Sequence, residues 1–135
     1  MRLPLLLAFV MLIASCSRNA VHDQSNSLRG KWKLTSSAIS IGGPATWQDA
    51  DPNNPSYVEF TASGKIIFSD KSSKTTFDYA NFEEGKLSVT SANTSVEYWY
   101  TLKENELTLD GGGCIEQCTR KYKKISSATD RISYP

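Results

Sequence analysis

The sequence predicts an all-β fold, an antiparallel up-and-down barrel of eight strands. Eight short segments, spaced at intervals of about ten residues, alternate apolar and polar side chains as half-buried strands do. Tight turns connect these segments, except after the first one. No long stretch has the 3.6-residue apolar period of an amphipathic helix. A sandwich of two sheets fits the same pattern and is the alternative fold.

The first expected strand covers residues 28–34. Leu28, Trp32 and Leu34 share its inward face, and cationic side chains occupy positions on the other face. Gly30 also lies on the inward face, where a glycine allows a bend or the close approach of another backbone.

A long connection rich in Gly, Pro and Asn follows at residues 36–55. A connection of this length in a small domain is usually functional or mobile. It contains Trp47, whose indole we expect to cover the mouth of the barrel as a plug. A position on the outer surface is the alternative for this side chain.

The remaining strands are short, and their inward aromatic side chains form the candidate pocket wall. We expect these strands at residues 56–61, 65–69, 75–79, 86–91, 95–102, 106–110 and 119–125. The candidate ligand-binding residues are Phe60, Phe68, Phe77, Tyr79, Tyr98 and Tyr100, together with Trp47. Eight strands leave an interior that side chains can just fill, or that admits one small ligand.

Residues 1–15 have the features of a signal peptide, because Arg2 precedes an apolar run too short to cross a bilayer as a helix. The tetrad that ends in Cys16, Ile-Ala-Ser-Cys, resembles the lipobox of bacterial lipoproteins. This resemblance implies cleavage before Cys16 and attachment of diacylglycerol and a fatty acyl chain such as palmitate to that residue. An ordinary signal peptide is the alternative.

The lipobox resemblance also predicts the location and the domain order. We expect a flexible tether at residues 16–27, the barrel domain at 28–126 and a tail at 127–135. Ser17 resembles the residue that follows the acylated cysteine in lipoproteins of the outer membrane. The expected location is therefore the bacterial cell envelope, on the outer membrane, with the domain facing the periplasm.

The charge of the chain is nearly balanced, with 15 Lys and Arg against 14 Asp and Glu, which argues against a nucleic-acid partner. The single histidine, His22, lies in the expected tether, where catalytic geometry cannot be held. We therefore expect no enzyme activity, no metal site and no cofactor, and we expect a monomer.

Cys114 and Cys118 are an even pair in a chain expected to be exported, which predicts a disulfide. In a straight strand their Cα atoms would be about 13 Å apart, whereas a disulfide needs less than ~7 Å. Residues 115–117 are therefore expected to form a turn or a bulge.

The triplet Gly30-Lys31-Trp32 resembles the G-x-W signature of lipocalins, and residues 28–125 resemble small bacterial lipocalin-like lipoproteins. The resemblance implies an eight-stranded barrel with an apolar pocket. It also implies that Trp32 is structural and lies at one end of the barrel, under a basic side chain from the last strand. Arg120 is the best match for that side chain. Since no helix is expected after the last strand, the barrel should be small and partly filled.

Two functions remain open from the sequence. The first is a membrane-anchored binding protein that holds a small hydrophobic or amphiphilic ligand in the barrel. The second is an interaction or inhibitor protein of the cell envelope, with a filled barrel and outward aromatic residues such as Tyr57 and Trp99. The basic run at residues 120–124 could meet an acidic ligand at the barrel mouth, but a solvated edge is the interpretation that we favour.

Overall fold

The computed structural model describes residues 28–114 and 118–126. The expected signal peptide, Cys16 and the tether lie outside the described residues, as do the turn expected at 115–117 and the tail at 127–135. These expectations stay predictions. Within the described ranges, no helix is long and apolar enough to cross a membrane.

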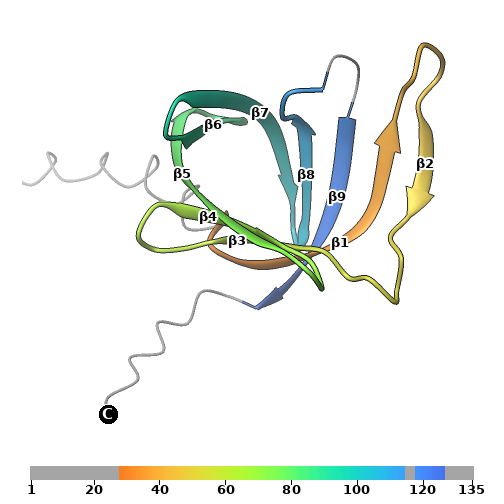
Figure 1. The fold of residues 1–135 in the computed structure, drawn as a ribbon, viewed down its shortest axis with the longest axis horizontal. Helices are drawn as coiled ribbons and strands as arrows, with labels where there is room; N and C mark the ends of the chain where they lie inside the picture. The colour runs from red at the N-terminus through yellow and green to blue at the C-terminus, as the bar shows by residue number, and fades with distance from the viewer. Residues whose placement is uncertain (1–27, 115–117, 127–135) are drawn as a thin grey trace, which may run out of the picture.

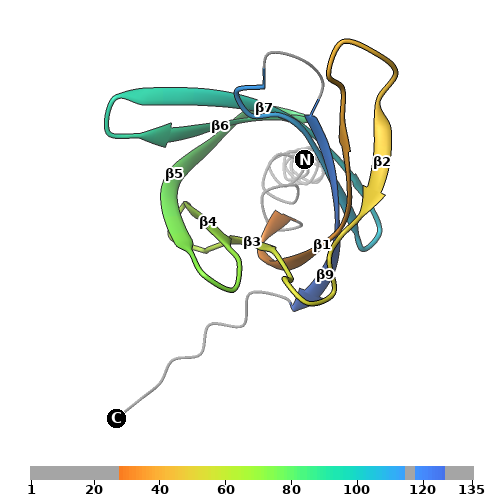
Figure 2. The same ribbon diagram turned by 45° about the vertical axis from the view of Figure 1, so that its right-hand side comes forward.

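One antiparallel sheet contains all nine strands of the described residues and closes into a barrel (Figures 1 and 2). The strands are β1 (Gly30–Ile39), β2 (Thr46–Asp49), β3 (Tyr57–Phe60), β4 (Lys65–Ser69), β5 (Lys74–Glu83), β6 (Lys86–Ser91), β7 (Thr94–Lys103), β8 (Glu106–Gly111) and β9 (Cys118–Ser126). Each strand from β3 to β8 pairs with the next, and β1 pairs with both β3 and β9. This closure confirms the up-and-down barrel of eight strands and excludes the two-sheet sandwich.

The prediction of one long connection at residues 36–55 was wrong, because the first part of this range forms a β-hairpin. β1 continues to Ile39, and β2 turns back along it, so that Trp47 lies opposite Ala38. The extra strand lies outside the barrel ring (Figure 1). The alternation of β1 is interrupted by a bulge between Leu34 and Ser36, which conceals the continuation of the strand from an analysis of periodicity.

Trp47 lies on the outer surface, so the expectation of a plug was wrong. Ala38 is opposite Trp47 on one side and Thr119 on the other, and paired residues project to the same face of a sheet. Nζ of Lys121 lies 4.6 Å from the centroid of the Trp47 ring. The indole therefore covers the outer face of the β1–β9 seam, where Ala38 and Thr119 are buried.

One end of the barrel is filled by side chains, and we call it the filled end. Seven large residues there are fully buried: Leu28, Trp32, Val58, Phe60, Ile66, Leu87 and Leu107. Nε1–H of Trp32 donates a 2.8 Å hydrogen bond to the carbonyl oxygen of Leu28. The indole therefore has its polar atom satisfied and acts as the base of the core.

The cation over Trp32 is Lys124, whose Nζ lies 5.0 Å from the ring centroid. The prediction of Arg120 was wrong. In the β1–β9 ladder Lys124 is directly opposite Trp32, whereas Arg120 is opposite Ser37, toward the other end of the barrel. Arg120 and Lys124 share one face of β9 because they are four residues apart, so only the register distinguishes them.

Candidate functional site: a cup at the open end of the barrel

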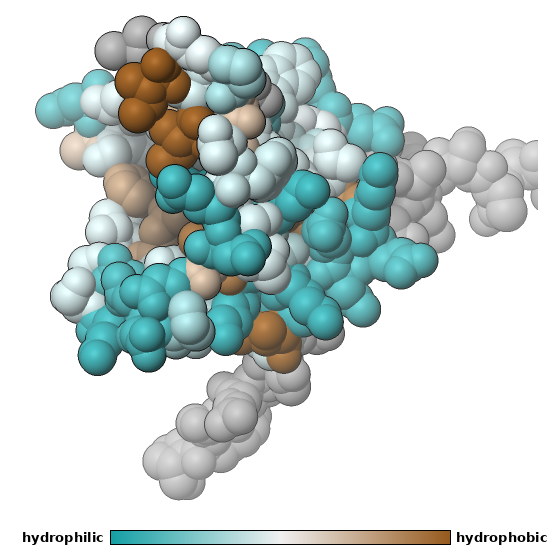
Figure 3. Space-filling view, turned by 90° about the vertical axis from the view of Figure 1, so that its right-hand side faces the viewer, coloured by the Kyte–Doolittle hydropathy of each residue, from teal (hydrophilic) through white to brown (hydrophobic). Residues whose placement is uncertain are grey.

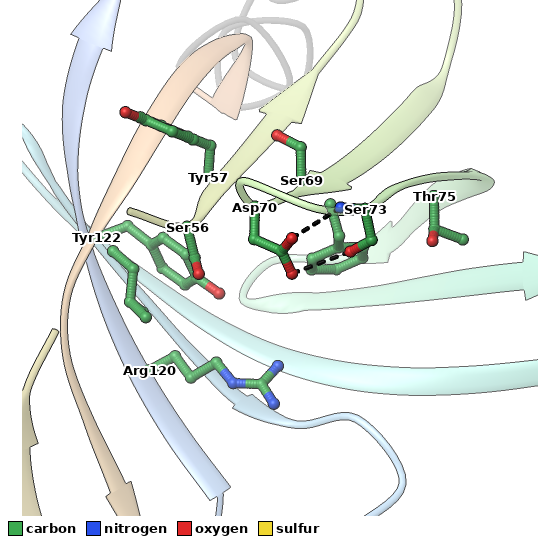
Figure 4. Close-up of a pocket in the computed structure, with 10 residues that line it drawn as sticks. Ser56, Tyr57, Ser69, Asp70, Ser73, Thr75, Arg120 and Tyr122 are labelled. Atoms are coloured by element: carbon green, nitrogen blue, oxygen red, sulfur yellow. Dashed lines mark hydrogen bonds between the residues drawn. The ribbon is translucent and has the colours of Figure 1, made fainter. Parts of the chain in front are cut away.

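The end of the barrel opposite Trp32 is hollow, and we call it the open end. A cavity of about 260 Å³ lies there, and we call it the cup (Figure 4). The residues that line it are Leu34, Ser56, Tyr57, Phe68, Ser69, Asp70, Ser73, Thr75, Arg120 and Tyr122. They come from β1, β3, β4, β5, β9 and the connections before β3 and after β4. The described core therefore stops short of the open end.

The floor of the cup is apolar. Leu34 and Tyr122 lie opposite each other on β1 and β9, and Phe68 reaches the cup from β4. Phe68 stacks on Tyr98 with a centroid distance of 6.4 Å and an interplanar angle of 29°. It also contacts Phe77 edge-on at 6.1 Å. The ring of Phe68 therefore packs against two other aromatic rings, and these contacts favour its position on the floor.

The rim of the cup is polar, and the β4–β5 loop forms much of it. Oδ1 of Asp70 accepts hydrogen bonds from the backbone N–H of Ser72 at 2.7 Å and of Ser73 at 2.8 Å. The hydroxyls of Ser72 and Ser73 donate to Oδ1 at 3.0 Å and to Oδ2 at 2.9 Å, and Figure 4 marks the bonds from Ser73. These bonds, led by the backbone N–H of Ser72, lower the pKa of Asp70 from 3.8 to about 2.

Arg120 is the cation of the cup. It shares an inward face of β9 with Tyr122, and its guanidinium extends into the open space (Figure 4). Burial raises the pKa of Tyr98 and of Tyr122, and the positive charge of Arg120 acts against that rise in both. Both phenols therefore stay protonated at neutral pH and keep an O–H donor near the guanidinium.

The aromatic residues predicted as ligand contacts occupy different layers of the barrel. Only Phe68 is among the residues that line the cup. The rings of Phe77 and Tyr98 contact the ring of Phe68, but neither residue lines the cup. Three others lie deeper: Phe60 and Tyr100 are buried in the core, and Tyr79 meets Phe60 edge-on at 5.2 Å. Trp47 is on the outer surface.

The cysteine pair lies at the same end of the barrel as the cup. Cys114 and Cys118 form the predicted disulfide, with their Cα atoms 6.1 Å apart. The bridge joins the segment after β8 to the first residue of β9, two positions before Arg120. It therefore closes the β8–β9 connection next to the strand that carries the cation.

Reasoning from the sequence missed the polar rim. Asp70 followed by Ser72 and Ser73 is a pattern typical of a turn in which the carboxylate accepts backbone N–H groups. That signal predicts the loop, but it does not place the loop beside a cavity. Ser56 and Thr75 gave no signal, because the ends of two separate strands bring them to the rim.

The fold and the cup define a class of protein, a small up-and-down β-barrel with one filled and one open end. In the part of the chain that the structure describes, no three His, Cys, Asp or Glu residues are grouped closely enough to hold a metal ion. A search against protein-family models finds no matching family, and a search of curated proteins finds no match.

Proposed function

We propose that this protein is a membrane-anchored, lipocalin-like binding protein that holds a small hydrophobic or amphiphilic molecule in the cup. The observation that carries the proposal is the asymmetry of the interior. Side chains fill the barrel around Trp32, yet about 260 Å³ is left at the other end, between the apolar floor and the polar rim. Ligand sites in proteins combine these same two kinds of wall.

The volume of the cup limits the size of the ligand. Water-sized groups occupy ~30 Å³ each, so the cup has room for roughly nine of them. It is somewhat smaller than the ~300–1,000 Å³ pockets that take drug-sized molecules. A single short chain with a small head fits this volume, whereas a sterol or a second chain does not.

The anchor in this proposal is the acylated Cys16, and the polar residues after it form the tether. One acyl chain gives only marginal membrane binding, whereas several chains on one residue anchor a protein stably. A barrel held in this way in the cell envelope, facing the periplasm, would meet amphiphiles released from the membrane.

The proposal is tested by displacement of an environment-sensitive naphthalene dye from the full chain in lipid nanodiscs, with empty nanodiscs as the reference. We expect 1-octanol to displace the dye from the wild type. Phe68→Trp puts a larger ring into the cup and should abolish dye binding. Ile67→Trp is the matched control, because Ile67 is the adjacent β4 residue and faces outward. Equal dye binding by all three proteins and the empty nanodiscs would refute the proposal.

The alternative, an interaction protein of the cell envelope, is favoured by a different observation. Ile41 is 93% exposed between β1 and β2, and Trp99 on β7 is 57% exposed. Figure 3 shows apolar residues at the upper end of the face formed by β1 and β2. This function predicts one envelope protein that cross-links to the wild type and no longer to Ile41→Ser or Trp99→Ala. Identical cross-linked products from all three would count against it.

A further inference from the structure

We propose that Arg120 is the headgroup site of the cup, and that the bound molecule is a single-chain amphiphile with an anionic head, either a carboxylate or a phosphate monoester. The inference rests on the proposed function and deepens it by naming the ligand class. It also reverses the interpretation of Arg120 as part of a solvated edge.

The position of Arg120 in β9 is the first argument. In the ladders it is opposite Ser37 of β1 and Leu109 of β8, and it alternates with Lys121 on the outer face. Its side chain therefore points into the barrel from the strand that closes the ring. Figure 4 shows the guanidinium in the space below Asp70 and Ser73, with the phenol of Tyr122 beside it.

The second argument is the charge around the guanidinium. Neither the Lys65–Asp78 nor the Lys86–Glu97 ion pair includes Arg120. Among the residues that line the cup the only acid is Asp70, and four hydrogen bonds from its own loop hold its carboxylate. These bonds hold the Asp70 carboxylate at the rim. The planar guanidinium of Arg120 faces the cavity, and its paired N–H donors match the geometry of an oxyanion.

The third argument is the set of groups around the cation. The phenols of Tyr98 and Tyr122 are within the field of Arg120, since its charge acts on both. Tyr122 lines the cup, so its phenol O–H and the guanidinium can both donate to the oxygens of an anionic head, whereas Tyr98 is not among the lining residues. Leu34 and Phe68 lie on the apolar floor beneath this head, where a short alkyl chain would pack. The two halves of the cup thus match the two halves of one amphiphile.

The test compares four ligands of equal chain length: octanoate, octyl phosphate, 1-octanol and octylammonium. Their dissociation constants are measured by titration calorimetry on the full chain in nanodiscs, with the heat of empty nanodiscs subtracted. We expect both anions to bind the wild type about tenfold more tightly than octanol, the effect of one charge-assisted contact. The tighter of the two anions then identifies the head as carboxylate or phosphate.

Arg120→Gln should remove the preference for anions, so that octanoate and octyl phosphate bind this variant no more tightly than 1-octanol does. Lys123→Gln is the matched control: it makes the same change of charge on the same strand, but Lys123 faces outward and is exposed. This control should keep the preference. Arg120→Lys keeps the positive charge but lacks the paired N–H donors of the guanidinium, so it should keep part of the preference for anions. It replaces Arg120→Gln in the test if Arg120→Gln does not fold, as judged by the absence of a cooperative unfolding transition.

The possible outcomes distinguish a failure of the headgroup site from a failure of the proposed binding function. If octanol or octylammonium binds the wild type as tightly as the anions do, the headgroup site is refuted while the cup remains a binding site. The same holds if Arg120→Gln and Arg120→Lys both keep the full preference. If none of the four ligands binds, the proposed function fails and the inference fails with it.

Discussion

Gly30 occupies a position that no other residue can fill without moving the backbone. A Cβ atom there would lie 2.3 Å from the carbonyl oxygen of Ser126. Its φ of +121° is also a conformation that side chains disfavour. Both constraints arise where β1 meets the end of β9, so the glycine permits the last contact of the barrel seam.

Gly30→Ala should therefore destabilise the protein by about 2 kcal/mol or more, because strain and a backbone clash act together. Urea unfolding followed by tryptophan fluorescence measures the change. Gly43→Ala is the control, since Gly43 has no positive φ and a Cβ atom there would meet no heavy atom within 4 Å, and it should leave the midpoint nearly unchanged. Equal midpoints for Gly30→Ala and Gly43→Ala would show that the backbone of Ser126 does not approach Gly30 as closely as the structure has it.

Lys124 and Arg120 are both inward on β9, yet they should differ in what they contribute to stability. Lys124→Gln removes the cation from the face of the buried Trp32 ring and should lower the unfolding free energy by about 0.5–2 kcal/mol. Arg120→Gln should change it by less than about 0.5 kcal/mol, because its side chain is exposed in the cup. Chemical denaturation of the two variants measures this, and the reverse order would contradict the β1–β9 register that places Lys124 opposite Trp32.

The role of Trp32 could be predicted from the sequence, but the identity of the cation over its ring could not. Trp32 was predicted as a structural residue from its triplet, and alternation placed a basic residue of the last strand on the inward face. Choosing between Arg120 and Lys124 required the β1–β9 register, which contains two irregularities, one on each side of the Trp32–Leu34 stretch. A bulge shifts the pairing without leaving a clear mark in the sequence.

The β4–β5 loop should be stable to unusually low pH. The pKa of Asp70 is lowered from 3.8 to about 2 by hydrogen bonds to its ionised form. Because the folded pKa lies below the unfolded value, the stabilisation is complete above pH 3.8 and is lost as the pH falls through about 2.

We expect the carboxyl carbon of Asp70 and the amides of Ser72 and Ser73 to titrate together in NMR spectra with a midpoint near 2. Ser73→Ala removes one donor and should move that midpoint toward 3.8. A wild-type midpoint already at 3.8 would show that the carboxylate is free, and the rim of the cup would then lack its fixed loop.

The disulfide should contribute modestly to stability, since it closes a very short loop. Chain entropy predicts about 2 kcal/mol for a bridge between residues four apart. The double variant Cys114→Ser, Cys118→Ser should therefore unfold cooperatively at a lower urea concentration, and a reducing agent should shift the wild type by the same amount. A variant that no longer folds would contradict this modest role.

The second half of β1 and the whole of β2 form a hairpin that sequence analysis did not find. Residues 35–37 of β1 are Thr, Ser and Ser, and β2 is Thr-Trp-Gln-Asp, so neither stretch alternates apolar and polar residues. β2 lies outside the barrel ring, and all four of its residues are exposed. Trp47 of this hairpin lies under Lys121 of β9, and a single indole in a polar stretch does not reveal from the sequence which surface it covers.

At the scale of the whole molecule, the barrel was predictable and the cup was not. Alternation along each strand fixes which side chains point inward, and closure follows when enough strands share one core. The volume left at one end depends on the stagger of the strands and on the size of the inward residues at each level. Large residues collect around Trp32, whereas Ser56, Ser69 and Thr75 end up around the mouth.

The central claim is that the open end of the barrel is a binding site, and its location can be read directly. We would record amide chemical shifts of the isotope-labelled full chain in nanodiscs during titration with octanoate. A ligand in the cup predicts saturable shifts confined to that end, at Leu34, Phe68, Arg120 and Tyr122, with none around Leu28 and Trp32 at the filled end. Shifts centred on Ile41 and Trp99 of the outer surface, with the cup unchanged, would contradict it.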